Sequence, residues 1–230
     1  MAIKFSKQTL PFLTEAGLQT DPNWLEENQA DYEAFVRQPF IDLAGRLKTS
    51  LQPSAPDYHF PTKGIGRIKK AANKVASGGP CYKDWLSISI SQPPASRFER
   101  NPHLFFGILP NIAPYMGVVV AGGLFMPSGP QLKKVRAAIA TNAQAFHTLF
   151  ADPAFNARFK VNFSRDNVTT RAPRGFEPDH PDMHWLKLKN FLIIKNLTHA
   201  EFTSTDLVSS VVKDFKQLLR LNRLIEDALS

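Results

Sequence analysis

The chain has 230 residues, a formal net charge of +8 and 43% hydrophobic residues, which favours one globular domain with a sizeable core and excludes a disordered chain. A lone cysteine, Cys81, excludes an intrachain disulfide and a cysteine-based zinc site. Because the N-terminus lacks signal-peptide features and the longest apolar run, Met116–Phe125, is too short to span a bilayer, we expect a cytoplasmic protein without membrane association. The composition does not predict an oligomeric state.

The predicted elements follow from apolar spacing, turn residues and helix caps. In chain order they are helices over Thr9–Leu18 and Asp21–Leu51, a short basic amphipathic helix over Gly64–Val75, strands over Leu86–Ser91, His103–Leu109 and Met116–Phe125, helices over Ser128–Thr141 and Asn142–Phe150, a hairpin of Phe159–Phe163 with Val168–Arg171, a strand over Asn190–Asn196 and a helix over Ser204–Leu229. Strands and helices do not alternate regularly. This predicts a single α+β domain over residues 1–230, with a central, mostly antiparallel sheet and helices at both ends of the chain.

The segment Arg171–Phe191, RAPRGFEPDHPDMHWLKLKNF, is the densest cluster of charged residues in the chain. Arg174, Lys187 and Lys189 in it are candidates for binding a phosphate or carboxylate, because arginine offers a planar fork and lysine a point charge. The alternative is a structural network in which Arg174 pairs with Asp179 or Glu177. Both interpretations stay open at the level of sequence.

Two glycines, Gly122 and Gly123, precede Pro127 and the predicted helix that begins at Ser128. Glycines there bring bare backbone close to a ligand, or they permit tight packing of a strand against a helix. The helix has Leu132, Val135 and Ile139 on its inward side and Lys133, Lys134 and Arg136 on its outward side. We expect Arg136, together with Lys83, to add positive charge to a basic cleft.

Asp179 and His180 are the candidate catalytic residues, because a histidine beside a carboxylate can carry a proton. His180 and His184 share a helical face, and with Asp179 they form a possible metal site. Pro181 favours a structural role, in which Asp179 or His180 caps a helix. We expect no metal and no cofactor, because the chain lacks the zinc-protease, nucleophile-elbow and dinucleotide-binding motifs.

Several short motifs follow one another along the chain between about Thr9 and Leu224. They are Asn23-Trp24-Leu25 with Asn28, Tyr32 and Pro39; Gly122-Gly123-Leu124-Phe125-Met126-Pro127 with Leu132 and Arg136; and Pro173-Arg174-Gly175-Phe176, Asp179-His180-Pro181 and Lys189. Together they resemble a family of conserved bacterial and fungal proteins classed as a domain of unknown function, the DUF2461 type. The resemblance implies a common fold and a shared pocket, and no activity.

The chain departs from that family at one place. The family has a basic Arg-Asp-x-Arg-Phe segment leading into Pro-Tyr-Lys, whereas here Lys70–Val75 replaces the acid and both arginines, and Cys81 stands where the proline is expected. If that segment supplies polar groups to a site, this member lacks some of them.

The sequence therefore favours the binding of an anion in a basic cleft, either a phosphorylated or carboxylated small molecule or a nucleic-acid backbone. One alternative is a hydrolase or transferase that uses His180 and Asp179, with or without a metal. A second is a structural or interaction protein whose charges are paired or simply solvated.

Overall fold

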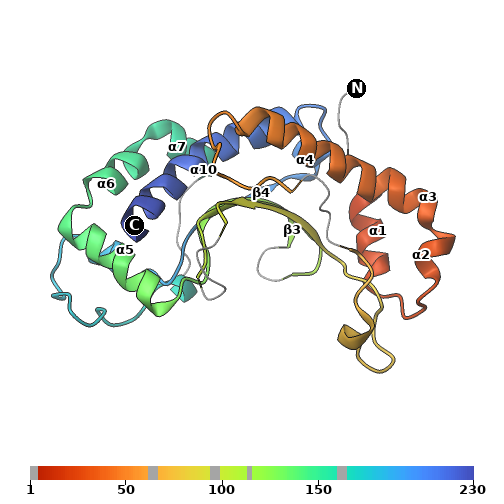
Figure 1. Ribbon diagram of the computed structural model, residues 1–230, viewed down its shortest axis with the longest axis horizontal. Coiled ribbons are helices and arrows are strands. Elements are labelled where there is room, and N and C mark those ends of the chain that lie inside the picture. Colours follow the sequence, from red (N-terminus) through yellow and green to blue (C-terminus); the bar gives the residue numbers. More distant parts are fainter. Residues whose placement is uncertain (1–4, 62–66, 94–98, 113–115, 160–164) are drawn as a thin grey trace. The chain divides into compact units, whose positions relative to one another are not determined.

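The computed structural model describes residues 5–61, 67–93, 99–112, 116–159 and 165–230. In chain order its elements (Figure 1) are α1 Thr9–Ala16, α2 Trp24–Glu27, α3 Gln29–Tyr32, the π-helical turn η1 Glu33–Arg37, α4 Gln38–Leu51, the 3₁₀ turn η2 Ala72–Lys74, β1 Leu86–Ser91, β2 His103–Leu109, β3 Gly117–Leu124, α5 Gly129–Thr141, α6 Gln144–Ala151, α7 Pro153–Phe159, the 3₁₀ turn η3 Arg165–Asn167, α8 Met183–Leu186, β4 Phe191–Leu197, α9 His199–Phe202 and α10 Leu207–Leu229.

The α+β fold predicted from the sequence is confirmed. Four strands of the described chain form one antiparallel sheet in the order β1-β2-β3-β4, and helices stand at both ends of the chain. β1 alternates buried and more exposed residues, as its LSISIS sequence predicts, whereas β3 is buried along nearly its whole length. β3 therefore lies inside the sheet, between β2 and β4.

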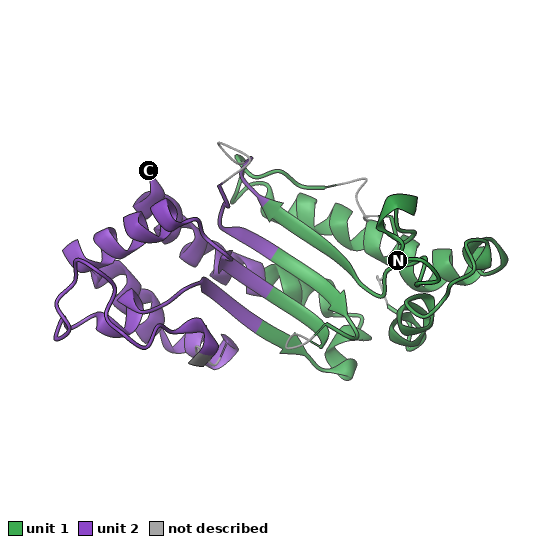
Figure 2. Cartoon of the chain, turned by 90° about the horizontal axis from the view of Figure 1, so that it is seen from below, with its two compact units in different colours: residues 1–90, 105–120, 195–213 green, residues 91–104, 121–194, 214–230 purple. Residues whose placement is uncertain are grey.

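The chain divides into two compact units (Figure 2). Unit 1 comprises Met1–Ile90, Phe105–Val120 and Lys195–Lys213, and unit 2 comprises Ser91–Leu104, Ala121–Ile194 and Asp214–Ser230. The prediction of a single domain over residues 1–230 stays a prediction. None of the helices in the described ranges combines the length and the apolar character that crossing a membrane requires.

The core of unit 1 is aromatic. Phe5 stacks on Phe202 of α9 with ring centroids 4.7 Å apart, and Phe40 of α4 meets Phe106 of β2 edge-on at 5.9 Å. The fully buried Tyr82 lies against Trp24 and also donates its hydroxyl proton to the carbonyl of Pro22 at 2.7 Å. The same hydroxyl accepts a bond from the backbone N–H of Leu25 at 3.2 Å. Trp24, which belongs to the motifs described above, and Tyr82 therefore pack together in the core of unit 1.

In unit 2, α6 and α7 lie alongside the C-terminal part of α10 (Figure 1). Arg158 of α7 pairs with Asp214, whose side chain is fully buried. Arg220 pairs with Asp152, the residue that follows α6, at 2.7 Å. The first turn of α5 is closed by a capping box, because Ser128 and Gln131 each bond the other's backbone N–H. The predicted start of this helix at Ser128 is confirmed.

Two predicted elements are wrong. Of the helix expected over Gly64–Val75, residues 64–66 lie outside the described residues, and the rest is extended apart from the short η2 turn. Lys69 instead forms an antiparallel bridge with Tyr82, flanked by bonds from Lys70 N to Cys81 O and from Lys83 N to Ile68 O. Ile68 is therefore buried in an extended, strand-like segment. The spacing of the apolar residues alone does not distinguish this arrangement from a helix.

The first strand of the hairpin expected for Phe159–Phe163 with Val168–Arg171 lies almost wholly outside the described residues, and the second strand is not formed. Phe159 is the last residue of α7, and residues 160–163 lie outside the described residues. Val168 pairs with Leu188 in an isolated bridge. The long helix predicted over Asp21–Leu51 is divided into α2, α3, η1 and α4. Pro39 lies in the first turn of α4, but the helix does not restart there, because α4 begins at Gln38 and continues directly from η1.

Candidate functional site

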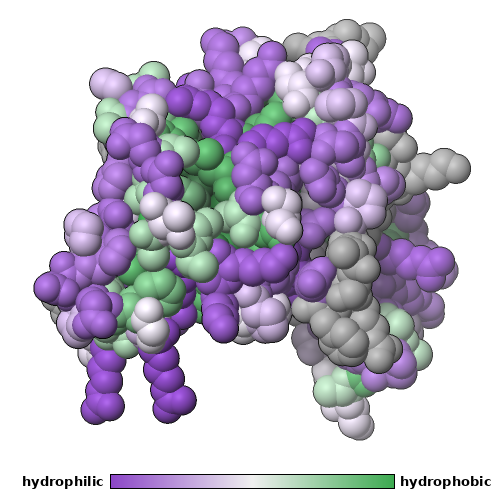
Figure 3. Space-filling view, turned by 60° about the vertical axis from the view of Figure 1, so that its left-hand side comes forward, coloured by the Kyte–Doolittle hydropathy of each residue, from purple (hydrophilic) through white to green (hydrophobic). Residues whose placement is uncertain are grey.

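Most of the positive charge of the chain belongs to unit 2. By sequence, its segments carry 15 Lys and Arg against 9 Asp and Glu, a formal +6 of the chain's +8, whereas unit 1 carries 13 against 11. Figure 3 shows mainly hydrophilic residues on the face turned forward there, with hydrophobic residues visible between them. The excess of basic over acidic residues is therefore larger in unit 2 than in unit 1.

A hydrogen-bonded network fixes the Gly122–Pro127 turn, which connects β3 to α5. The backbone N–H of Met126 donates to Oδ1 of Asn190 at 2.6 Å, and Nδ2 of Asn190 donates to Oδ1 of Asn167 at 3.0 Å. The backbone N–H of Asn190 also donates to Oδ1 of Asn167, and Nδ2 of Asn167 returns a bond to the Asn190 carbonyl at 2.9 Å. The two asparagines thus tie the turn to the segment before β4.

Arg136 of α5 reaches the same segment. Its Nη2 donates to the carbonyl of Leu188 at 3.1 Å, while its Nε is buried and has no hydrogen-bond partner. Burial also lowers the pKa of the guanidinium, because removal from water disfavours the charged form. Within the described part of the chain, Arg136 makes no ion pair with a carboxylate. The sequence placed Arg136 on the outward side of the helix, but the side chain is partly buried.

The two lysines on either side of Leu188 lie in the backbone that Arg136 contacts. Lys187 is partly buried, and its carbonyl accepts a bond from Thr169 N at 2.9 Å. Lys189 is exposed, and its Nζ donates to the carbonyl of Asp166 at 2.9 Å. Among the described residues neither lysine is paired with a carboxylate. The fold therefore brings Arg136, Lys187 and Lys189 to one short segment.

The structure does not show Arg174 or Lys83 at the segment around Leu188 that Arg136 contacts. Arg174 is exposed beside Gly175, and the predicted ion pair with Asp179 or Glu177 does not form within the described ranges. Lys83 belongs to unit 1, where its Nζ lies 5.0 Å from the centre of the Trp85 ring, a cation–π arrangement. Lys83 therefore has a partner within its own unit.

Neither Gly122 nor Gly123 leaves room for a side chain. A Cβ on Gly122 would lie 2.6 Å from the Cβ of Leu218, and one on Gly123 would lie 1.9 Å from the carbonyl oxygen of Phe191. Gly123 also has φ +123, a conformation that side chains rarely adopt. Tight packing, one of the two sequence interpretations, accounts for both positions. A ligand contact there stays a prediction.

The histidine and carboxylate in contact are His147 and Asp182, and not the predicted pair His180 and Asp179. Nε2 of His147 lies 2.5 Å from Oδ1 of the buried Asp182, while Asp179 is exposed. Nδ1 of His180 accepts a bond from the backbone N–H of Asp182 at 3.0 Å. Asp182 rather than Asp179 or His180 precedes α8, so the predicted cap is wrong in position.

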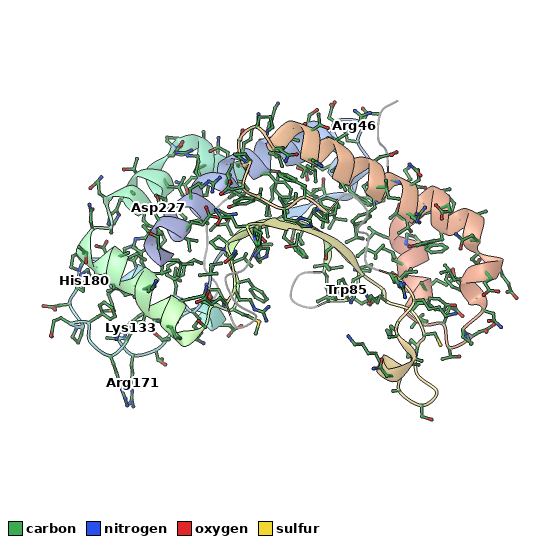
Figure 4. All side chains as sticks on the ribbon, in the orientation of Figure 1. Arg46, Trp85, Lys133, Arg171, His180 and Asp227 are labelled. Atoms are coloured by element: carbon green, nitrogen blue, oxygen red, sulfur yellow. The ribbon has the colours of Figure 1, made fainter. Side chains whose placement is uncertain are left out.

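The arrangement around these histidines does not form a metal centre. The ring centroids of His147 and His184 are 6.3 Å apart. In the ranges that the structure describes, no three His, Cys, Asp or Glu side chains are grouped so as to hold a metal ion. Figure 4 labels His180 on the loop of unit 2 that also carries Arg171, whose side chain extends away from the ribbon.

Sequence reasoning missed Asn167, Asn190 and His147. Asn190 stands at the start of a strongly apolar strand, a position where a polar residue commonly marks a turn, and this was an available signal. Asn167 and His147 contact partners 23 and 35 residues away in sequence, and no local pattern indicates such pairs.

The antiparallel sheet with helices at both ends, together with the charge of unit 2, defines a basic α+β protein. A family model described as Conserved hypothetical protein (DUF2461) matches residues 8–223, and the chain belongs to this family. The resemblance stated from the motifs is thereby confirmed, and the family has no established activity. Neither a curated protein nor a protein of solved structure matches the chain.

Proposed function

We propose that unit 2 binds an anion, either a phosphorylated or carboxylated small molecule or a nucleic-acid backbone, with Arg136 as the main contact. The observation that carries the proposal is the partly buried guanidinium, whose Nε has no hydrogen-bond partner and which has no carboxylate beside it in the described chain. A cation withdrawn from water is stabilised when an opposite charge accepts its hydrogen bonds. A phosphate or carboxylate supplies both the charge and the acceptors.

The surrounding charges support this function. Lys187 and Lys189 stand on either side of the carbonyl that Arg136 contacts, and neither is neutralised by an acid within the described ranges. Several acids of unit 2 are engaged elsewhere, since Asp152 and Asp214 pair with Arg220 and Arg158. Arg174 adds a further exposed charge to the same unit. The net positive field of unit 2 therefore favours the approach of anions.

Calorimetric titration with inorganic phosphate and with citrate tests the proposal. Arg136→Met keeps the length of the side chain and removes its charge, and we expect at least about tenfold weaker binding, since a charged hydrogen bond contributes roughly 1.5–3 kcal/mol. Arg220→Met is the matched control, because it removes one positive charge from unit 2 at a guanidinium already paired with Asp152. Equal affinities for wild type and Arg136→Met would contradict the proposal.

The nucleic-acid form of the proposal has its own measurement. Binding of a short duplex DNA should weaken steeply with salt, because phosphate contacts release condensed counterions. A flat response between about 50 and 200 mM salt, the range over which the effect is roughly a thousandfold for several contacts, would leave the small-molecule form as the only one supported.

A second candidate is a hydrolase or transferase, and one observation favours it. The buried Asp182 holds Nε2 of the half-exposed His147, which leaves Nδ1 as the ring atom available to exchange a proton with a substrate. This moves the proton-carrying pair from His180 and Asp179 to His147 and Asp182. A panel of phosphate and carboxylate esters tests it: turnover should be lost in His147→Gln and kept in His180→Gln. The reverse pattern would favour the pair expected from the sequence.

A further inference from the structure

The Gly122–Pro127 turn exposes two large apolar side chains in succession. Phe125 is 37% exposed and Met126 is 63% exposed, whereas β3, which ends at Leu124, is buried from Val118 onward. Met126 has φ +50, and in the described part of the chain it is the only residue other than glycine with a positive φ. This conformation costs an ordinary side chain roughly 1–2 kcal/mol. The turn is therefore held in an unfavourable geometry with its apolar side chains outward.

The hydrogen bond that fixes Met126 joins it to the same segment that Arg136 contacts. Asn190 accepts the Met126 N–H, and Asn190 is two residues after Leu188, whose carbonyl binds the Arg136 guanidinium. Two residues of extended chain span at most about 7 Å. Met126 and the Arg136 guanidinium are thus both hydrogen-bonded to one short segment of unit 2, Leu188–Asn190.

Resting on the proposed function, we propose that the anion bound at Arg136 is amphiphilic, with a charged phosphate or carboxylate group and an aromatic or apolar body. The charged group contacts Arg136, and the body lies against Phe125 and Met126. Methionine adapts its shape to irregular surfaces and its sulfur contacts aromatic rings favourably, and phenylalanine offers a flat apolar face. A site with both parts discriminates such a ligand from a bare inorganic anion.

A comparison of inorganic phosphate with 2-naphthyl phosphate tests this inference. We expect naphthyl phosphate to bind roughly 10-fold to 100-fold more tightly, as burial of on the order of 100 Å² of apolar surface predicts. Met126→Gly should reduce the preference for naphthyl phosphate over phosphate at least about fivefold. Glycine readily adopts positive φ, so this variant relieves backbone strain and is expected to fold. Met116→Gly is the matched control, since Met116 is 60% exposed but belongs to unit 1.

The outcomes separate the two proposals. If phosphate and naphthyl phosphate bind with equal affinity, or if Met126→Gly leaves the preference unchanged, the amphiphilic ligand is excluded while anion binding stands. If neither compound binds, or if Arg136→Met binds both as the wild type does, the proposed function fails and this inference fails with it. Loss of the preference in Met116→Gly as well would also overturn the assignment to the Gly122–Pro127 turn.

Discussion

Replacement of Gly123 by alanine tests whether the Gly122–Pro127 turn is built by backbone packing. A Cβ at this position would lie 1.9 Å from the carbonyl oxygen of Phe191 in β4, so the two backbones would have to separate by about 1 Å to reach a tolerable contact. Overpacking of this kind costs roughly 1–3 kcal/mol, and holding alanine at φ +123 costs a further 1–3 kcal/mol or so. We therefore expect Gly123→Ala to lower the free energy of unfolding by about 3–5 kcal/mol.

Urea unfolding monitored by circular dichroism measures this change, and two other glycines provide the scale. Gly122→Ala places its Cβ against the side chain of Leu218, which can shift, and should cost roughly 1–3 kcal/mol. Gly45 has open space around its Cβ position inside α4, so Gly45→Ala should stabilise the protein by about 0.5–1 kcal/mol. A Gly123→Ala protein within about 1 kcal/mol of wild type would refute the reasoning, as would equal effects at all three positions.

Three further predictions concern buried polar groups. Tyr82→Phe should lower the free energy of unfolding by roughly 1–3 kcal/mol, because it leaves the Leu25 N–H without its partner and removes one of the two donors to the Pro22 carbonyl, the other being Lys69 Nζ; a urea titration showing no change would contradict the role assigned to the hydroxyl. Arg158→Met should destabilise more than Asp214→Asn in the same assay, because it removes the cation beside a fully buried carboxylate charge, whereas Asp214→Asn removes the buried charge itself and keeps a guanidinium that is 27% exposed; the opposite order would contradict this. Burial lowers the pKa of His103, so the unfolded chain binds a proton more readily than the folded one. The resulting stabilisation of the folded state is present above the ordinary histidine pKa of about 6.5 and is lost as the pH falls through and below that value. The melting temperature of His103→Gln should therefore depend less on pH between about 7.5 and 5 than that of wild type. Equal slopes of melting temperature against pH in the two proteins would contradict this prediction.

The strands were predictable because their signal is local. The alternation of Leu86–Ser91 and the apolar runs of the other strands place side chains on opposite faces within a few residues, and the structure forms these strands within one or two residues of the predicted bounds. The prediction of a helix over Gly64–Val75 was wrong because the conformation of this segment depends on a contact outside it. Its apolar spacing fits a helix, but the pairing of Lys69 with Tyr82 decides the conformation, and the periodicity of the segment itself does not indicate that partner.

The candidate site was predictable in its residues and not in its geometry. Lys187 and Lys189 belong to a dense charged segment, and Arg136 was expected on the outward side of the helix that begins at Ser128. Their convergence depends on the contact of Arg136 with Leu188, 52 residues away in sequence. The contact of His147 with Asp182 has the same cause, since α6 and the segment before α8 are close only in the fold.

The distinction between exposed and buried charge decides how the basic character of this protein should be interpreted. Lys133 and Arg174 are solvated, so their charges cost nothing in the absence of a ligand and carry little information about one. Arg136 differs because its desolvation is unfavourable and no carboxylate of the described chain offsets it. A methionine of similar length would avoid that cost but would leave the Leu188 carbonyl without the donor that Nη2 of Arg136 supplies. The proposal of anion binding therefore rests on Arg136 and not on the exposed cations.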